Sequence, residues 1–300
     1  MPLTSVYFVC TTGFLLSIAM VYIFLGWIIF RRWKYFKCSF FRIYLVATAV
    51  NLTSICVQFM TYRLPFHTCS HCLLADFFRK KHFFGMEVIN FLYVHCSIVQ
   101  YNICLILSFN RLHSLYYPSS CEKKWRNMFF SLSLLAVCAP LIIDYPLIRG
   151  QSFYQFVDKM DMFQTRSTAY SNELFNGVIV YSGVITTINL ILNVLMASYL
   201  ISKRDREIKS SERKLCIMTT ILFCLQFFNF VRSILWNIYN DHEQRNSLVN
   251  RLLLYMEPIF LDLMVSFPPI ILVLCSRIIQ RQIHEIFFAK DKIPLASQAL

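Results

Sequence analysis

Seven long apolar runs divide this sequence, and they restrict its possible folds more than any other feature. They lie at residues 6–30, 43–62, 83–109, 128–147, 174–201, 215–239 and 252–275. A run of about 20 residues is long enough for a helix to cross the hydrocarbon core of a bilayer. Only helices and closed barrels satisfy all backbone hydrogen bonds in lipid, and the runs lack the alternation of barrel strands. We therefore predict an all-α fold, a bundle of seven transmembrane helices.

The composition also indicates an integral membrane protein. Of the 300 residues, 57% are hydrophobic and only 15% are charged, whereas a soluble domain of this size needs more polar surface. The net charge of +13 would suggest nucleic acid in a soluble chain, but here the basic residues lie between apolar runs and meet anionic lipid. We predict a lipid bilayer around one domain covering residues 1–300, and no nucleic-acid partner.

Lysine and arginine are distributed unequally between the two sides of the predicted bundle. The side that holds the segments after the first, third, fifth and seventh runs has nineteen of them, and the other side has nine. By the positive-inside rule, the richer side is cytoplasmic. This predicts an extracellular N-terminus, a first run that is retained as a signal anchor, and a cytoplasmic tail at residues 276–300.

The beginning of that tail has the periodicity of an amphipathic helix. Between Arg277 and Phe288, apolar residues recur at spacings of three and four, at Ile279, Ile283, Ile286 and Phe287. Such a pattern is typical of a short helix that lies on the inner leaflet. We therefore add a short amphipathic C-terminal helix to the predicted bundle.

Ionisable side chains inside the apolar runs are the first candidates for function, because their burial in lipid is costly. They are Glu87, Asp144, Arg232, Glu257 and Asp262. At a rise of about 1.5 Å per residue, Arg232 lies at nearly the depth of Glu257, so a pairing between them is reasonable. The pair would either fix the packing of the sixth and seventh helices or contact a polar ligand.

Two adjacent prolines, Pro268 and Pro269, follow Asp262 in the seventh run. Each proline removes a backbone hydrogen bond and favours a kink. A kink below a buried carboxylate suits a helix that bends when a ligand binds, although prolines also occur in transmembrane helices that switch nothing.

The third run ends at a polar pair, Asn110 and Arg111, where we expect the helix to meet water. The guanidinium of Arg111 stays charged, and we expect it to pair with Glu212, just before the sixth run, in a resting state. Outward movement of the sixth helix would break this pair. The alternative is an arginine that only anchors the helix at the lipid headgroups.

One dense cluster of possible metal ligands lies between the second and third runs, at residues 67–72, with two histidines and two cysteines. This side is expected to face an oxidising space, where thiols pair. We expect a disulfide or plain exposure of Cys69 and Cys72 rather than a metal site. No catalytic triad spacing, phosphate loop or set of histidine boxes is found, so we predict no enzyme activity and no cofactor.

Several short motifs resemble those of nematode serpentine chemoreceptors, most of all the class gamma family. They are Ser39-Phe40-Phe41-Arg42, Asn51, Arg63-Leu64-Pro65, Asn110-Arg111 with Pro118 and Trp125, and Asp262 with Pro268. The resemblance implies a G-protein-coupled receptor in the plasma or ciliary membrane of sensory neurons, with a heterotrimeric G protein as its partner. It also places Asn110-Arg111 where rhodopsin-like receptors carry an acidic-Arg-Tyr triplet. The segment 149–173 has no cysteine, so the disulfide that commonly ties it to the third helix there cannot form.

We therefore predict a chemosensory receptor that binds a small, volatile or apolar environmental molecule between the third, fifth, sixth and seventh helices. Ligand binding would favour an arrangement in which the sixth helix moves outward. A seven-span transporter or channel, with ionisable residues along its path, is the alternative. The ligand-binding candidates are Glu87, Phe91, Tyr181, Arg232, Trp236, Glu257 and Asp262, with Tyr93 as a further aromatic, and the switch candidates are Asn110, Arg111, Glu212, Pro268 and Pro269.

Overall fold

Seven helices that are long and apolar enough to cross a membrane dominate the computed structural model of this chain. The structure describes residues 2–36, 38–79, 85–158, 161–169, 171–202, 210–239 and 248–288. Within these residues, the predicted all-α bundle and the predicted C-terminal helix are confirmed.

The spans begin with α1 (Pro2–Arg31), followed by α2 (Ser39–Gln58), which continues through the π-helical turn η2 (Phe59–Arg63) into α3 (Leu64–Phe66). The later spans are α5 (Met86–Tyr116), α6 (Pro118–Cys138) with α7 (Leu141–Asp144), α9 (Asn172–Ser202), α10 (Ser210–Tyr239) and α11 (Leu248–Cys275). The connecting elements are η1 (Trp33–Tyr35), α4 (Ala75–Arg79), α8 (Pro146–Arg149), β1 (Ser152–Val157) and β2 (Met162–Ser167), and α12 (Arg277–Phe288) ends the described chain.

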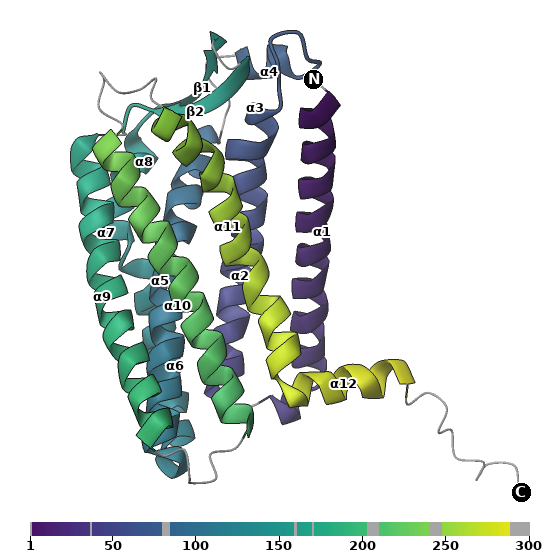
Figure 1. The fold of residues 1–300 in the computed structure, drawn as a ribbon, viewed down its shortest axis with the longest axis vertical. Coiled ribbons are helices and arrows are strands. Elements are labelled where there is room, and N and C mark those ends of the chain that lie inside the picture. Colours follow the sequence, from purple (N-terminus) through teal and green to yellow (C-terminus); the bar gives the residue numbers. More distant parts are fainter. Residues whose placement is uncertain are drawn as a thin grey trace, which may run out of the picture.

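The two ends of the bundle carry different elements. Strands β1 and β2 form an antiparallel hairpin, which lies with α4 and the start of α1 at one end, here named the hairpin end (Figure 1). At the opposite end, named the α12 end, α12 runs roughly perpendicular to the spanning helices, from the end of α11 past the end of α1 (Figure 1). The hairpin was not predicted, because residues 149–173 were treated only as a connecting loop.

Helix α5 is the centre of the bundle. It contacts α2, α6, α9 and α10. Of the residues in its most apolar stretch, 61% are buried, against 17% for the span Ser120–Asp144. Since a polar side chain on α5 has neighbours on several sides, this helix is best placed to carry a site inside the bundle.

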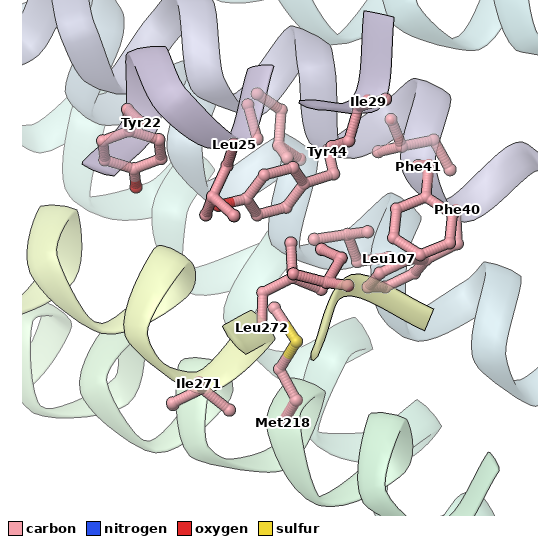
Figure 2. Packing of buried hydrophobic residues seen from close by; sticks show 14 of the residues in the cluster. Tyr22, Leu25, Ile29, Phe40, Phe41, Tyr44, Leu107, Met218, Ile271 and Leu272 are labelled. Atoms are coloured by element: carbon pink, nitrogen blue, oxygen red, sulfur yellow. The ribbon is translucent and has the colours of Figure 1, made fainter. Parts of the chain in front are cut away.

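A continuous apolar core joins six of the spans, and Figure 2 shows part of it. Its almost fully buried members include Tyr22 of α1, Tyr44 of α2, Leu107 of α5, Met218 of α10 and Leu272 of α11. The hydroxyl of Tyr22 also donates a hydrogen bond to the Val265 carbonyl at 2.7 Å. Polar contacts therefore add to apolar packing in fixing α1 against α11.

Prolines shape the fourth and seventh spans differently. In the fourth span, Pro140 precedes α7 and Pro146 begins α8, so the predicted run 128–147 consists of several helical pieces. A proline fits the first turn of a helix, because the backbone nitrogens of that turn donate no hydrogen bond within the helix. In contrast, α11 continues through Pro258, Pro268 and Pro269 as one helix. A ligand-dependent bend at the last two prolines stays a prediction.

Candidate functional site

A cavity of about 590 Å³ lies near the hairpin end, between η2, α5, α9, α10, α11 and strand β2. This volume is in the range of sites that bind small molecules. Four of its walls are the predicted third, fifth, sixth and seventh spans. The other two walls, η2 and β2, were missed by the sequence analysis.

An ion pair lies in the wall of this cavity, between Arg232 of α10 and Glu257 of α11. Arg232 Nη1 is 3.3 Å from Glu257 Oε2, and only 10% and 11% of the two side chains are exposed. The hydroxyls of Tyr62 and Tyr93 both donate hydrogen bonds to Glu257 Oε1 at 2.8 Å. These four residues are named the Glu257 cluster. Three donors from η2, α5 and α10 stabilise one carboxylate, which is what a charge buried in the membrane requires.

A second buried ion pair joins α11 to the second span. Arg63, at the end of η2, donates a hydrogen bond to Asp262, and the two side chains are 5% and 14% exposed. The predicted second run ended at residue 62 and so left Arg63 outside the bundle, which was wrong. A π-helical turn changes the direction of side chains relative to an α-helix, and Arg63, as the last residue of η2, enters the bundle. The signal in the sequence was an arginine within one helical turn of an apolar run.

The Arg63 contact gives Asp262 a structural partner away from the cavity lining. A role of Asp262 in ligand binding stays a prediction. Helix α11 carries two carboxylates that face different neighbours: Glu257 pairs with α10 and Asp262 pairs with η2. The position of α11 between these two neighbours is thus set by charge as well as by packing.

Among the other ligand-binding candidates, Trp236 lines the cavity, but Glu87, Phe91 and Tyr181 do not. Phe91 stacks on His95, with ring centroids 5.1 Å apart. Tyr181 donates a hydrogen bond to Asn102 Oδ1 at 3.0 Å.

Glu87, Phe91 and Tyr181 stay predictions as ligand-binding residues. Phe91 and His95 are four residues apart and stack on each other, and Glu87 lies at the start of α5, before the first α5 residue that lines the cavity, Asn90. The α5 residues that line the cavity are Asn90, Tyr93, Val94, Ser97, Ile98 and Tyr101.

The ionisable candidate Asp144 also has a structural partner. His95 Nδ1 lies 2.7 Å from Asp144 Oδ2, and the Asp144 side chain is fully buried. This contact ties α5 to α7, away from the cavity lining. His95 could have been recognised from the sequence, because it is a polar residue inside an apolar run.

A chain of buried amide and hydroxyl groups leads from the cavity into the bundle. Asn229 Nδ2, at the cavity, donates to the Tyr101 hydroxyl at 3.1 Å, and this hydroxyl donates to the Gln226 carbonyl at 3.3 Å. Asn189 Nδ2 donates to Gln226 Oε1 at 3.0 Å, and Asn193 Nδ2 donates to Asn189 Oδ1 at the same distance. The network joins α5, α9 and α10. It was missed, although asparagine and glutamine in apolar runs are typical contacts between transmembrane helices.

At the α12 end, Asn110 and Arg111 lie inside a helix rather than at its end, because α5 continues to Tyr116. Arg111 is only 5% exposed and Asn110 is fully buried, so the expected position at the water boundary is corrected. Arg111 Nη2 donates to Asn110 Oδ1 at 2.8 Å, and its guanidinium lies 4.3 Å from the ring centroid of Phe40. The Glu212 side chain is outside the described residues, so its pairing with Arg111 stays a prediction.

The cysteine-rich segment between α3 and α4 contains a disulfide between Cys69 and Cys72. Of the two outcomes expected for these cysteines, pairing rather than plain exposure is observed. In the described part of the chain, no group of three or more histidine, cysteine, aspartate or glutamate side chains is arranged to hold a metal ion.

Comparison with known proteins gives consistent results over nearly the whole chain. A family model described as "Srg family chemoreceptor" matches residues 8–283. Serpentine receptor class gamma-31 of Caenorhabditis elegans is 22% identical over 271 residues, which cover 88% of this chain and 86% of that protein. Serpentine receptor class gamma-9 of the same organism is 24% identical over 266 residues, covering 87% and 75% of the two chains.

Proposed function

This chain belongs to the Srg family of chemoreceptors, and from that premise we propose that it is a G-protein-coupled receptor with its ligand site in the cavity at the hairpin end. The observation that carries the proposal is the Glu257 cluster. It places a buried ion pair in the wall of a cavity that is large enough for a small molecule. Buried charges in a membrane protein usually mark a pathway or a ligand site.

The lining of the cavity favours a ligand with hydrogen-bonding groups among the small, volatile or apolar molecules first expected. Amide and hydroxyl side chains from four walls face it, and aromatic rings supply apolar area. Sites of this kind combine apolar contact area with a few polar groups that fix orientation. The polar lining residues include Asn90, Ser97, Thr165, Asn176, Ser182, Asn229 and Asn237.

The hairpin end is proposed to face the outside and the α12 end the cytoplasm. The disulfide between Cys69 and Cys72 lies at the hairpin end, and disulfides persist in oxidising spaces. Most lysines and arginines of the connecting segments belong to the other end, in agreement with the positive-inside rule. The chain would then receive its ligand from outside and contact its G protein inside.

The proposed mechanism is a shift in population between two helix arrangements. A ligand that contacts Arg232 or Glu257 would compete with the ion pair between α10 and α11. The amide network from Asn229 to Asn193 would carry the rearrangement of α10 towards Arg111 at the α12 end. A full reversal of a resting population needs roughly 5 kcal/mol of differential affinity, and several charge-assisted hydrogen bonds can supply this.

The proposal is tested by G-protein nucleotide exchange in membranes that carry the full chain, screened with small odorants and polar metabolites. Ligand-dependent exchange is the expected result. Uptake or transmembrane current from the same compounds, without exchange, would contradict the receptor proposal and favour the transporter or channel alternative.

Replacement of Arg111 by alanine is expected to reduce ligand-driven exchange on the order of tenfold, equivalent to about 1.4 kcal/mol. The reason is that its guanidinium packs on Phe40 and bonds Asn110 between α2 and α5. Arg126→Ala is the matched control, because Arg126 is an exposed arginine on α6. Equal ligand-driven exchange in both variants, at equal surface expression, would contradict the switch role of Arg111.

A further inference from the structure

The disulfide between Cys69 and Cys72 closes a very short turn at the surface of the hairpin end. Both cysteines are partly exposed, and His71 between them is exposed. A bridge across two intervening residues restricts the unfolded chain much less than one that closes a long loop. Exposed disulfides of this kind are also the ones most open to thiols. Global stability alone therefore gives little reason for this bridge.

The two sulfur atoms differ in their surroundings. The backbone N–H of Cys69 donates a hydrogen bond to Cys72 Sγ at 3.1 Å. A hydrogen bond to this sulfur stabilises the thiolate that leaves when the disulfide is attacked, and a better leaving group leaves faster. An external thiolate is thus expected to attack Cys69 Sγ and to release Cys72.

The same turn is bonded to the tip of the β1–β2 hairpin. The Ser70 N–H, inside the disulfide turn, donates to Asp161 Oδ1 at 3.0 Å, and Arg79 Nη2 donates to the Ser70 carbonyl at 2.7 Å. The Ser70 bond also lowers the pKa of the Asp161 carboxyl, so the acceptor is charged at neutral pH. Among the described non-glycine residues, Asp161 is the one with positive φ, at 49°. This conformation is uncommon, and the bond from Ser70 helps to hold it.

The hairpin in turn forms a wall of the ligand cavity. Gln164, Thr165 and Arg166 of β2 line it. Thr165 Oγ1 also donates to the Thr61 carbonyl of η2 at 2.8 Å, next to Tyr62 of the Glu257 cluster. A continuous set of contacts therefore leads from the disulfide turn through Asp161 to the cavity wall.

We propose that the Cys69–Cys72 disulfide is a thiol-exchange site, through which low-molecular-weight thiols outside the cell loosen the hairpin and so regulate the cavity. The first thiol forms a mixed disulfide with Cys69 and frees the Cys72 thiolate, which takes up a proton. A second thiol attacks the sulfur of the bound thiol, so that the bond to Cys69 Sγ breaks. The oxidised dimer of the two thiols leaves, and the released Cys69 thiolate takes up a proton. Two thiols thus become one disulfide while the protein bridge becomes two thiols. The physiological role rests on the proposed function, but the structural switch does not require a ligand.

The test uses the full chain in lipid nanodiscs, with reduced glutathione as the thiol and no denaturant. We expect iodoacetamide to label Cys69 and Cys72 only after the thiol is added, and amide hydrogen exchange in the hairpin 152–167 to accelerate roughly tenfold as local opening becomes easier. An acid quench should trap glutathione on Cys69. A bridge that stays closed until the protein is denatured, or one that opens with no change in hairpin exchange, would overturn the proposal. Glutathione found mainly on Cys72 would overturn the direction of attack.

Two variants separate the links of the pathway. A Cys69→Ser, Cys72→Ser double variant should show the fast hairpin exchange without thiol and no further response to it, and a remaining response would assign the effect to another cysteine. Asp161→Ala should show fast exchange with the bridge open or closed, because the contact with Ser70 is lost. Slow, thiol-sensitive exchange in Asp161→Ala would contradict the pathway. Since none of these readouts needs a ligand, they stay informative even where the receptor test fails.

Discussion

Replacement of Asp262 by alanine is expected to lower the free energy of unfolding by about 3 kcal/mol or more, because it leaves the Arg63 charge buried without its partner. Arg63 is 5% exposed, and among the described residues its partner of opposite charge is Asp262. The loss should appear as a lower midpoint of thermal unfolding of the purified chain in detergent micelles.

Two controls make this expectation specific to the buried pair. Removal of both charges, in Arg63→Met with Asp262→Leu, should recover most of the stability, because apolar side chains of similar size often replace a buried ion pair at little cost. Asp76→Ala breaks the pair with Arg79, whose side chains are 56% and 91% exposed, and should change the midpoint little. A loss in Asp262→Ala no larger than that in Asp76→Ala would contradict the structural role of the pair.

Replacement of Glu257 by glutamine is expected to raise ligand-independent nucleotide exchange about tenfold, which corresponds to a shift of ~1.4 kcal/mol between resting and active arrangements. Glutamine keeps an acceptor for the hydroxyls of Tyr62 and Tyr93 but loses the charge opposite Arg232. The attraction between α10 and α11 is then weaker, so α10 is freer to move. Basal exchange at matched surface expression measures this effect.

A charge exchange at the same site is the matched control. In Arg232→Glu with Glu257→Arg, the attraction between α10 and α11 is restored, and basal exchange should return towards the wild-type level. Tyr62→Phe removes one hydrogen bond to Glu257 and no charge, so its effect should be smaller than that of Glu257→Gln. Equal basal exchange in wild type and Glu257→Gln would show that the ion pair does not hold the resting arrangement.

The candidate site could be predicted from the sequence only in part. Arg232, Trp236 and Glu257 all line the cavity. For Arg232 and Glu257 this could be expected, because an ionisable residue inside an apolar run is costly in contact with lipid and usually faces the interior of the bundle. Glu87 and Phe91 do not line the cavity, and Asp262 pairs with Arg63. Depth in the membrane can be counted along one helix, but the direction of a side chain depends on which neighbours surround that helix.

The number of spans, the amphipathic helix α12 and the family resemblance could all be read from the sequence alone. In lipid, a long apolar run without strand alternation satisfies its backbone hydrogen bonds only as a helix. The periodicity of α12 is visible within a dozen residues. The pairing of buried polar groups is visible only in the folded structure: Arg63 with Asp262, His95 with Asp144, and the hairpin with both the disulfide turn and the cavity. These contacts join residues far apart in the chain, and the π-helical turn at Phe59–Arg63 redirects one of them. Hydrophobicity is a local property of the chain, whereas the choice of a buried polar partner depends on how whole helices rotate against one another.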